Sequence, residues 1–182
     1  MLAGPLKANP RLRGFSIVEL MISLSLIMLL TLALLTSFTF IARGDRSLAN
    51  YGEMNAQARL LLDRLGADLR SATDVTNFTT TTLTLTLPAN PAVTSTVDVT
   101  WSYDEITRVL TRQEGITTTI YARDVDTFSF FYANGNNVQT TSLVEVKQVQ
   151  VSLRMLRLVA STITSEYVIS TQFTMRAKST TY

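Results

Sequence analysis

The sequence predicts an α+β fold in which one long N-terminal helix packs on a mainly antiparallel β-sheet. Three observations predict it. Residues 20–42 form an uncharged, apolar run. Apolar residues then recur at steps of three or four as far as Ala72. From Thr76 onward they alternate with threonines, a pattern that favours strands over helix. We therefore expect a polar leader, a transmembrane helix, an amphipathic half of the same helix and a β-rich domain, at residues 1–14, 15–42, 43–75 and 76–182.

The apolar run is long enough to cross a bilayer. A helix over its 23 residues rises about 35 Å, compared with about 30 Å of hydrocarbon. A secretory signal peptide is excluded by length, because its apolar region spans only about 7–15 residues. An uncleaved signal anchor explains the length and the basic leader, but it leaves Gly14, Phe15 and Glu19 without a reason.

Glu19 is an acid at the head of this run. An ionised acid costs about 2.5–3.5 kcal/mol in hydrocarbon. The 13 Leu, Ile and Phe residues between Leu20 and Ala42 offset it, at about 0.3–0.6 kcal/mol each. Glu19 can lie at the interface near the helix N-terminus, where the dipole favours negative charge. Alternatively, Glu19 pairs with an amine. A cut between Gly14 and Phe15 would create a new α-amino group one helical turn from Glu19, and the pair could form within one subunit or between neighbouring subunits.

The segment Gly14-Phe15-Ser16-Ile17-Val18-Glu19-Leu20, behind a leader with Lys7, Arg11 and Arg13, resembles the class III signal of type IV prepilins and type II secretion pseudopilins. The resemblance implies that prepilin peptidase cuts after Gly14 and N-methylates Phe15. It also implies that Glu19 pairs with the N-terminus of an adjacent subunit during filament assembly. Residues 58–72 further resemble the corresponding region of PilW-like minor pilins and J-type minor pseudopilins.

The resemblance implies a minor pilin or pseudopilin that is incorporated into, or primes, a type IV pilus or type II secretion pseudopilus. Its partners would be the peptidase, other pilin subunits and the membrane. The protein would cross the inner membrane once, with the leader in the cytoplasm and the C-terminal domain periplasmic or extracellular, and would join the pilus after assembly. The alternative is a monomeric, membrane-anchored extracytoplasmic binding domain or adhesin.

The amphipathic segment is expected to continue the membrane helix, with one face packed on the β-rich domain. Its packing stripe is expected to include Leu62, Leu65 and Leu69. The glycines at positions 44, 52 and 66 are points where the helix is weakest.

The β-rich domain is expected to contain seven alternating segments. Pro88 is expected to end the first of them, and Glu114-Gly115 and Asn134-Gly135 mark turns. A change of parity near Lys147 predicts a β-bulge. The expected strands cover residues 83–87, 97–103, 108–112, 117–121, 128–132, 143–158 and 167–175.

Composition argues against an enzyme and against a cofactor. The chain has no cysteine and no histidine, so disulfides, Cys or His zinc sites and the usual nucleophilic pairs are excluded. After leader removal, Lys147 and Lys178 are the only lysines. Lys147 is expected on an exposed strand and Lys178 in a polar tail, and no serine carries a nucleophile motif.

Two kinds of binding site, for calcium and for nucleic acid, are not expected from the sequence. Asp124, Asp126 and the loop at residues 134–137 could supply oxygen ligands to calcium, but they match no defined calcium loop and are better explained as turn residues. Removing the leader leaves 13 basic against 14 acidic residues, so the basic character belongs to the leader and nucleic acid is not an expected partner. The arginines that could form a DNA-binding patch are Arg108, Arg112, Arg123, Arg154 and Arg157.

Overall fold

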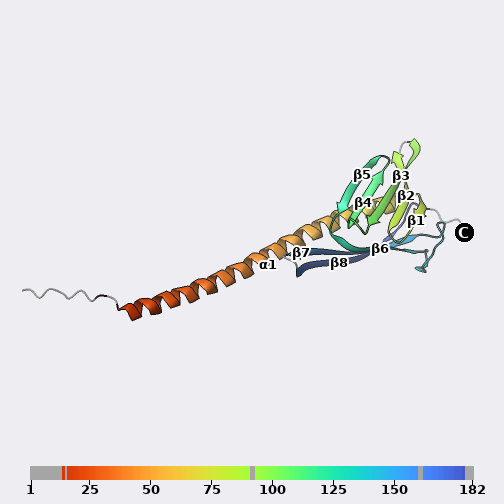
Figure 1. Ribbon diagram of the computed structural model, residues 1–182. Coiled ribbons are helices and arrows are strands. Elements are labelled where there is room, and N and C mark those ends of the chain that lie inside the picture. The colour runs from red at the N-terminus through yellow and green to blue at the C-terminus, as the bar shows by residue number, and fades with distance from the viewer. Residues whose placement is uncertain (1–13, 15, 91–92, 160–161, 179–182) are drawn as a thin grey trace, which may run out of the picture. The chain divides into compact units, whose positions relative to one another are not determined.

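The computed structural model describes residue 14 and residues 16–90, 93–159 and 162–178. It begins with helix α1, which is continuous over Ile17–Ser71 (Figure 1). The predicted joining of an apolar and an amphipathic half in one helix is therefore confirmed. The chain divides into two compact units, Met1–Gly44 and Asp45–Tyr182. Apart from Gly14, the expected leader lies outside the described residues.

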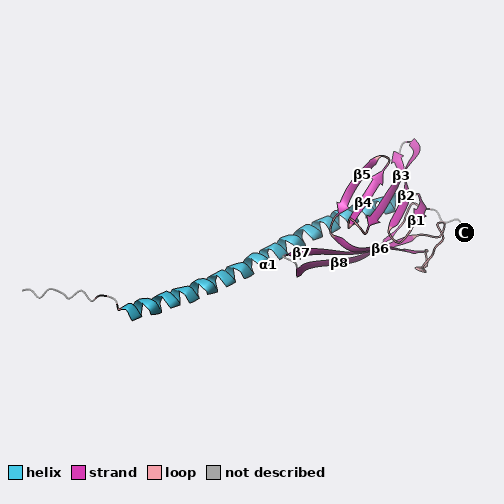
Figure 2. Ribbon diagram, in the orientation of Figure 1, coloured by secondary structure: helices cyan, strands magenta, loops and turns pink. Residues whose placement is uncertain are grey.

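The strands of the second unit form two antiparallel sheets, drawn in magenta in Figure 2. One sheet has five strands in the order β1-β2-β3-β4-β5, and the other has three in the order β6-β7-β8. The predicted α+β architecture is confirmed. The strands are β1 (Asp74–Phe78), β2 (Thr82–Asn90), β3 (Val93–Asp104), β4 (Val109–Glu114), β5 (Thr117–Ala122), β6 (Val125–Ala133), β7 (Gln148–Val159) and β8 (Thr162–Thr174).

One hydrophobic core joins α1 to the inner faces of both sheets. The helix contributes a stripe that starts at Met54, whereas Leu48 is exposed. Leu65 and Leu69 are buried as predicted, but the stripe also takes Leu61, and Leu62 is only partly buried. The sequence alone does not separate these adjacent leucines, because both fit a stripe with steps of three or four.

Hydrogen bonds from two buried tyrosines connect the two sheets. The Tyr132 hydroxyl, on β6, donates to the carbonyl oxygens of Thr79 and Thr82 at 2.7 and 3.1 Å. Burial raises the pKa of Tyr132, so this group remains a neutral donor. The Tyr103 hydroxyl, on β3, donates in the same way to the carbonyl of Val125 at 3.0 Å.

Several predicted boundaries are wrong for local reasons. Strand β7 begins at Gln148 rather than at residue 143, because residues 143–147 belong to turns and loop. The parity change near Lys147 therefore marks the start of a strand, and the β7–β8 register shift lies between Arg157 and Leu158. Strand β4 begins after Arg108, whose φ of 56° places it in the preceding turn.

Strands β1 and β2 also depart from the prediction. Strand β2 continues past Pro88 to Asn90, with a register irregularity after the proline. Strand β1 was not predicted, since its sequence DVTNF shows no apolar alternation. The Glu114-Gly115 turn is confirmed, and Gly115 has a φ of 58°, a conformation that suits glycine.

Gly66 marks a close approach of α1 to β8. A Cβ atom added there would lie 2.7 Å from Cε1 of Phe173. A Cβ atom at Gly52, elsewhere on the same helix, would meet no atom within 4 Å. The helix is continuous through both positions, so Gly66 is not a helix break. Its lack of a side chain leaves room for the Phe173 ring.

We expect Gly66→Ala and Gly52→Ala to change stability in opposite directions. Alanine at 52 gains up to about 1 kcal/mol of helix propensity. Alanine at 66 gains the same propensity but must displace the Phe173 ring, and overpacking costs about 1–3 kcal/mol. Urea denaturation of the two variants in detergent measures the difference. Equal stabilisation by both variants would contradict the close contact.

Candidate functional site

The residues at the head of α1 form the candidate site for processing and assembly. Gly14 is exposed, and a Cβ atom there would meet nothing within 4 Å. The helix begins at Ile17, and the Leu20 N–H donates to the carbonyl of Ser16 at 3.1 Å. Glu19 is exposed in the first helical turn. An exposed glycine thus lies three residues before the start of the helix, and an acid lies just inside it.

Glu19 has a favourable electrostatic position even before any partner is considered. The unpaired N–H groups of a first helical turn carry a partial positive charge, which a carboxylate stabilises. Ser16 and Glu19 also have the spacing of a capping box, with serine at the N-cap and an acid three residues later. Phe15, the expected methylation site, lies outside the described residues.

The first unit presents an apolar surface along α1. Its large apolar side chains from Ile17 to Ile41 are exposed. Such a surface requires lipid or apolar neighbours. Among the described residues, α1 is the one helix that is long and apolar enough to cross a membrane, judged by length and composition.

Several hydroxyl groups within the apolar half are satisfied by the helix itself. Ser23 donates to the carbonyl of Glu19 at 2.8 Å, and Ser25 and Thr31 donate to the carbonyls four residues before them. A hydroxyl in hydrocarbon is costly only when it lacks a partner. These serines and threonines are therefore compatible with burial in a membrane or a helix bundle.

Comparison with known families tests the N-terminus directly. Residues 10–35 match the family model of the prokaryotic N-terminal methylation motif. The match supports a prepilin-type protein of the type IV pilin and pseudopilin kind. No curated protein matches the chain. The motif implies processing by prepilin peptidase and assembly with other pilins. The apolar helix is consistent with anchoring in the inner membrane. Proteins with this motif are generally structural rather than enzymatic.

A charge network that the sequence did not predict lies in the second unit. Asp68 of α1 is buried and accepts hydrogen bonds from Arg112 Nε at 2.7 Å and from Trp101 Nε1 at 3.0 Å. Glu114 Oε2 accepts from Arg112 Nη1 at 2.6 Å. Arg64 also pairs with Asp68, at 3.3 Å. Their four-residue spacing predicts an ion pair on a solvated helix face, but the Asp68 side chain is buried. The helix is thereby fixed to β3 and β4.

The pKa shifts in this network follow from its geometry. Burial disfavours the charged guanidinium of Arg112, but hydrogen bonds to Asp68 and Glu114 outweigh it and raise its pKa. The hydrogen bond from Arg112 lowers the pKa of Glu114. Both shifts favour the ionised pair at neutral pH.

The candidate calcium ligands and most of the candidate DNA-binding arginines are paired with each other. Asp124 accepts from Arg157 at 2.8 Å, and Arg157 also pairs with Glu53 of α1. Asp126 lies 3.9 Å from Arg108 and 3.8 Å from Arg154. These carboxylates and guanidinium groups form a network of ion pairs that connects loops and strands of the second unit to α1. Among the described residues, no group of three acids is placed to hold a metal ion.

Lys178 lies in a different setting from the one that the sequence predicts. It was expected in a polar tail, yet it is buried and pairs with Asp74 of β1 at 3.2 Å. Its ammonium group also donates to the carbonyl of Leu143, and the Lys147 ammonium donates to the carbonyl of Lys178. Both lysines therefore anchor the residues that follow β8.

Proposed function

We propose that this chain is a minor pilin or pseudopilin, processed at Gly14 and incorporated through α1 into a type IV pilus or a type II secretion pseudopilus. The observation that carries the proposal is the methylation-motif match over residues 10–35. The exposed apolar face of α1 supports it, because a helix of this kind is stable in lipid and equally stable packed among similar helices.

The proposed assembly step transfers α1 from lipid to a bundle of neighbouring helices. Glu19 would neutralise the Phe15 amine of an adjacent subunit. Both charges are costly in apolar surroundings when separate, and pairing removes most of that cost. The leader would remain in the cytoplasm, as its Lys7, Arg11 and Arg13 favour.

The mature protein is expected to begin at Phe15 with one added methyl group on its amine. Intact-mass and N-terminal peptide mass spectrometry of the protein from cells that contain a prepilin peptidase measures this. The same chain from cells without the peptidase is the control and should retain the leader. A full-length chain in the presence of the peptidase would contradict the proposal.

A further inference from the structure

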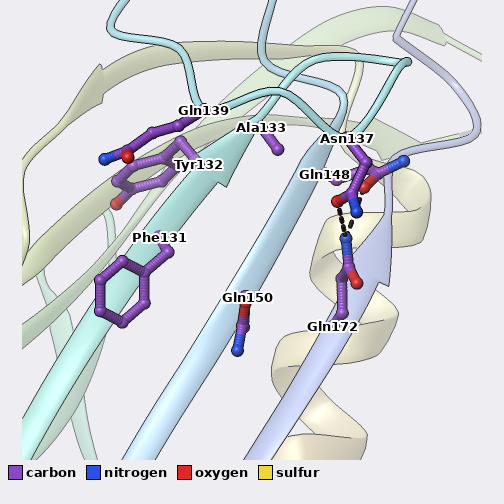
Figure 3. Close-up of a pocket in the computed structure, with 8 residues that line it drawn as sticks. All are labelled: Phe131, Tyr132, Ala133, Asn137, Gln139, Gln148, Gln150 and Gln172. Atoms are coloured by element: carbon purple, nitrogen blue, oxygen red, sulfur yellow. Dashed lines mark hydrogen bonds between the residues drawn. The ribbon is translucent and has the colours of Figure 1, made fainter.

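A pocket on the outer face of the three-stranded sheet is lined by side-chain amides, by Ala133 and by two aromatic residues, Phe131 and Tyr132 (Figure 3). Its volume is about 290 Å³. Five of its lining residues carry side-chain amides, and Phe131 presents a ring that is 47% exposed. The amide residues are Asn137, Gln139, Gln148, Gln150 and Gln172.

Strand register places the pocket residues side by side. Phe131 of β6 pairs with Gln150 of β7, and Gln150 pairs with Gln172 of β8. Side chains at paired positions lie on the same face of a sheet. The neighbouring row along the strands consists of three serines, Ser129, Ser152 and Ser170. The polar face is therefore built by three strands together.

The pocket wall is held in place before any ligand arrives. Gln172 Nε2 donates to Asn137 Oδ1 at 3.0 Å and to Gln148 Oε1, as the dashed lines in Figure 3 show. Asn137 has a φ of 63°. Its loop is fixed by Asn134 Oδ1, which accepts from two backbone N–H groups at 3.0 Å. A fixed wall lowers the entropy cost of binding.

The chemistry of the lining selects the class of ligand. The described residues that line the pocket carry no charge, so it offers no cation for a phosphate and no carboxylate for a metal. Each amide both donates and accepts hydrogen bonds, as does each hydroxyl of a sugar. An exposed ring beside such amides provides an apolar surface for the C–H face of a sugar ring.

We propose that this pocket binds a neutral carbohydrate through stacking on Phe131 and hydrogen bonds to the surrounding amides. Its volume of about 290 Å³ is just under the range of about 300–1,000 Å³ for small-ligand pockets, which suits one or two sugar rings. The site rests on β6, β7 and β8 and does not depend on how α1 assembles. Failure of filament incorporation and failure of sugar binding are therefore separate results.

Binding is tested on the mature full-length chain in a zwitterionic detergent, since glycoside detergents would compete for the pocket. The probes are neutral di- and trisaccharides of glucose, galactose and N-acetylglucosamine, a sialylated trisaccharide and a tetra-alanine peptide. Saturation-transfer NMR detects contact, and calorimetry gives affinity. We expect saturable binding of at least one neutral saccharide.

Phe131→Ala is expected to weaken that binding by about tenfold or more. Gln172→Ala is a second variant, which removes the amide that holds two neighbours. Val168→Ala is the matched control, because Val168 is exposed on the same face outside the pocket and should leave affinity unchanged. Fluorescence of Trp101 checks that each variant is folded.

Three results would overturn the proposal. One is the absence of saturable binding of any neutral saccharide up to about 10 mM. Another is equal affinity in Phe131→Ala and the unsubstituted chain. The third is binding of the peptide or the sialylated sugar in preference to every neutral one.

Discussion

Asp68→Asn is expected to lower the free energy of unfolding of the second unit by about 3–5 kcal/mol. The substitution removes the charge that Arg112 faces at 2.7 Å while Arg112 itself stays buried. Glu114 remains as a partner, but it lies at the edge of the network with 45% of its side chain exposed. A buried guanidinium without its main counter-charge is the expected cause of the loss.

Trp101 gives this prediction a direct measurement. It is the only tryptophan in the chain, and its indole N–H donates to Asp68. Urea denaturation followed by tryptophan fluorescence therefore reports on the same network that the substitution changes. Glu114→Gln is the control, because an exposed ion pair contributes only about 0–1 kcal/mol. If the two variants lost equal stability, Asp68 would have no special role.

The sequence predicted the parts of the fold that depend on local periodicity. The apolar run and the stripe at Leu65 and Leu69 predict one helix, and the alternation from Leu83 onward predicts a sheet. These patterns are strong because one face of each element must meet the core. The turn at Gly115 was also predictable from local sequence, because glycine readily adopts the positive φ found there.

What the sequence did not predict depends on contacts between distant residues. Asp68 is 44 positions from Arg112, so its helical spacing from Arg64 indicated only a surface pair. Lys178 is buried and pairs with Asp74, at the other end of the domain sequence. The amide pocket likewise arises only when β6, β7 and β8 are aligned in register. No periodic signal carries such information.

At the candidate assembly site, the sequence is more informative than the structure of a single chain. A short motif at Gly14 and Glu19 predicted the site, while the structure of one chain adds the start of the helix and the exposure of both residues. The partner proposed for Glu19 belongs to another subunit. Its role must therefore be separated from helix capping by the choice of substitutions.

Glu19→Gln is expected to leave leader removal unchanged and to reduce incorporation into filaments by tenfold or more. Glutamine keeps the size of the side chain and can still accept a capping hydrogen bond, but it has no charge to offer the Phe15 amine. An unpaired ammonium in apolar surroundings costs several kcal/mol, and each 1.4 kcal/mol corresponds to about tenfold. The measurement is the ratio of mature protein in sheared filaments to that in membranes.

Two further substitutions assign any defect to charge or to capping. Asp45→Asn removes one negative charge from an exposed position on the same helix, beyond the apolar run, and should incorporate normally. Glu19→Ala removes both charge and capping, and on the pairing mechanism it should be no more defective than Glu19→Gln. Normal incorporation of Glu19→Gln together with failure of Glu19→Ala would assign the residue to the helix start and reject pairing between subunits.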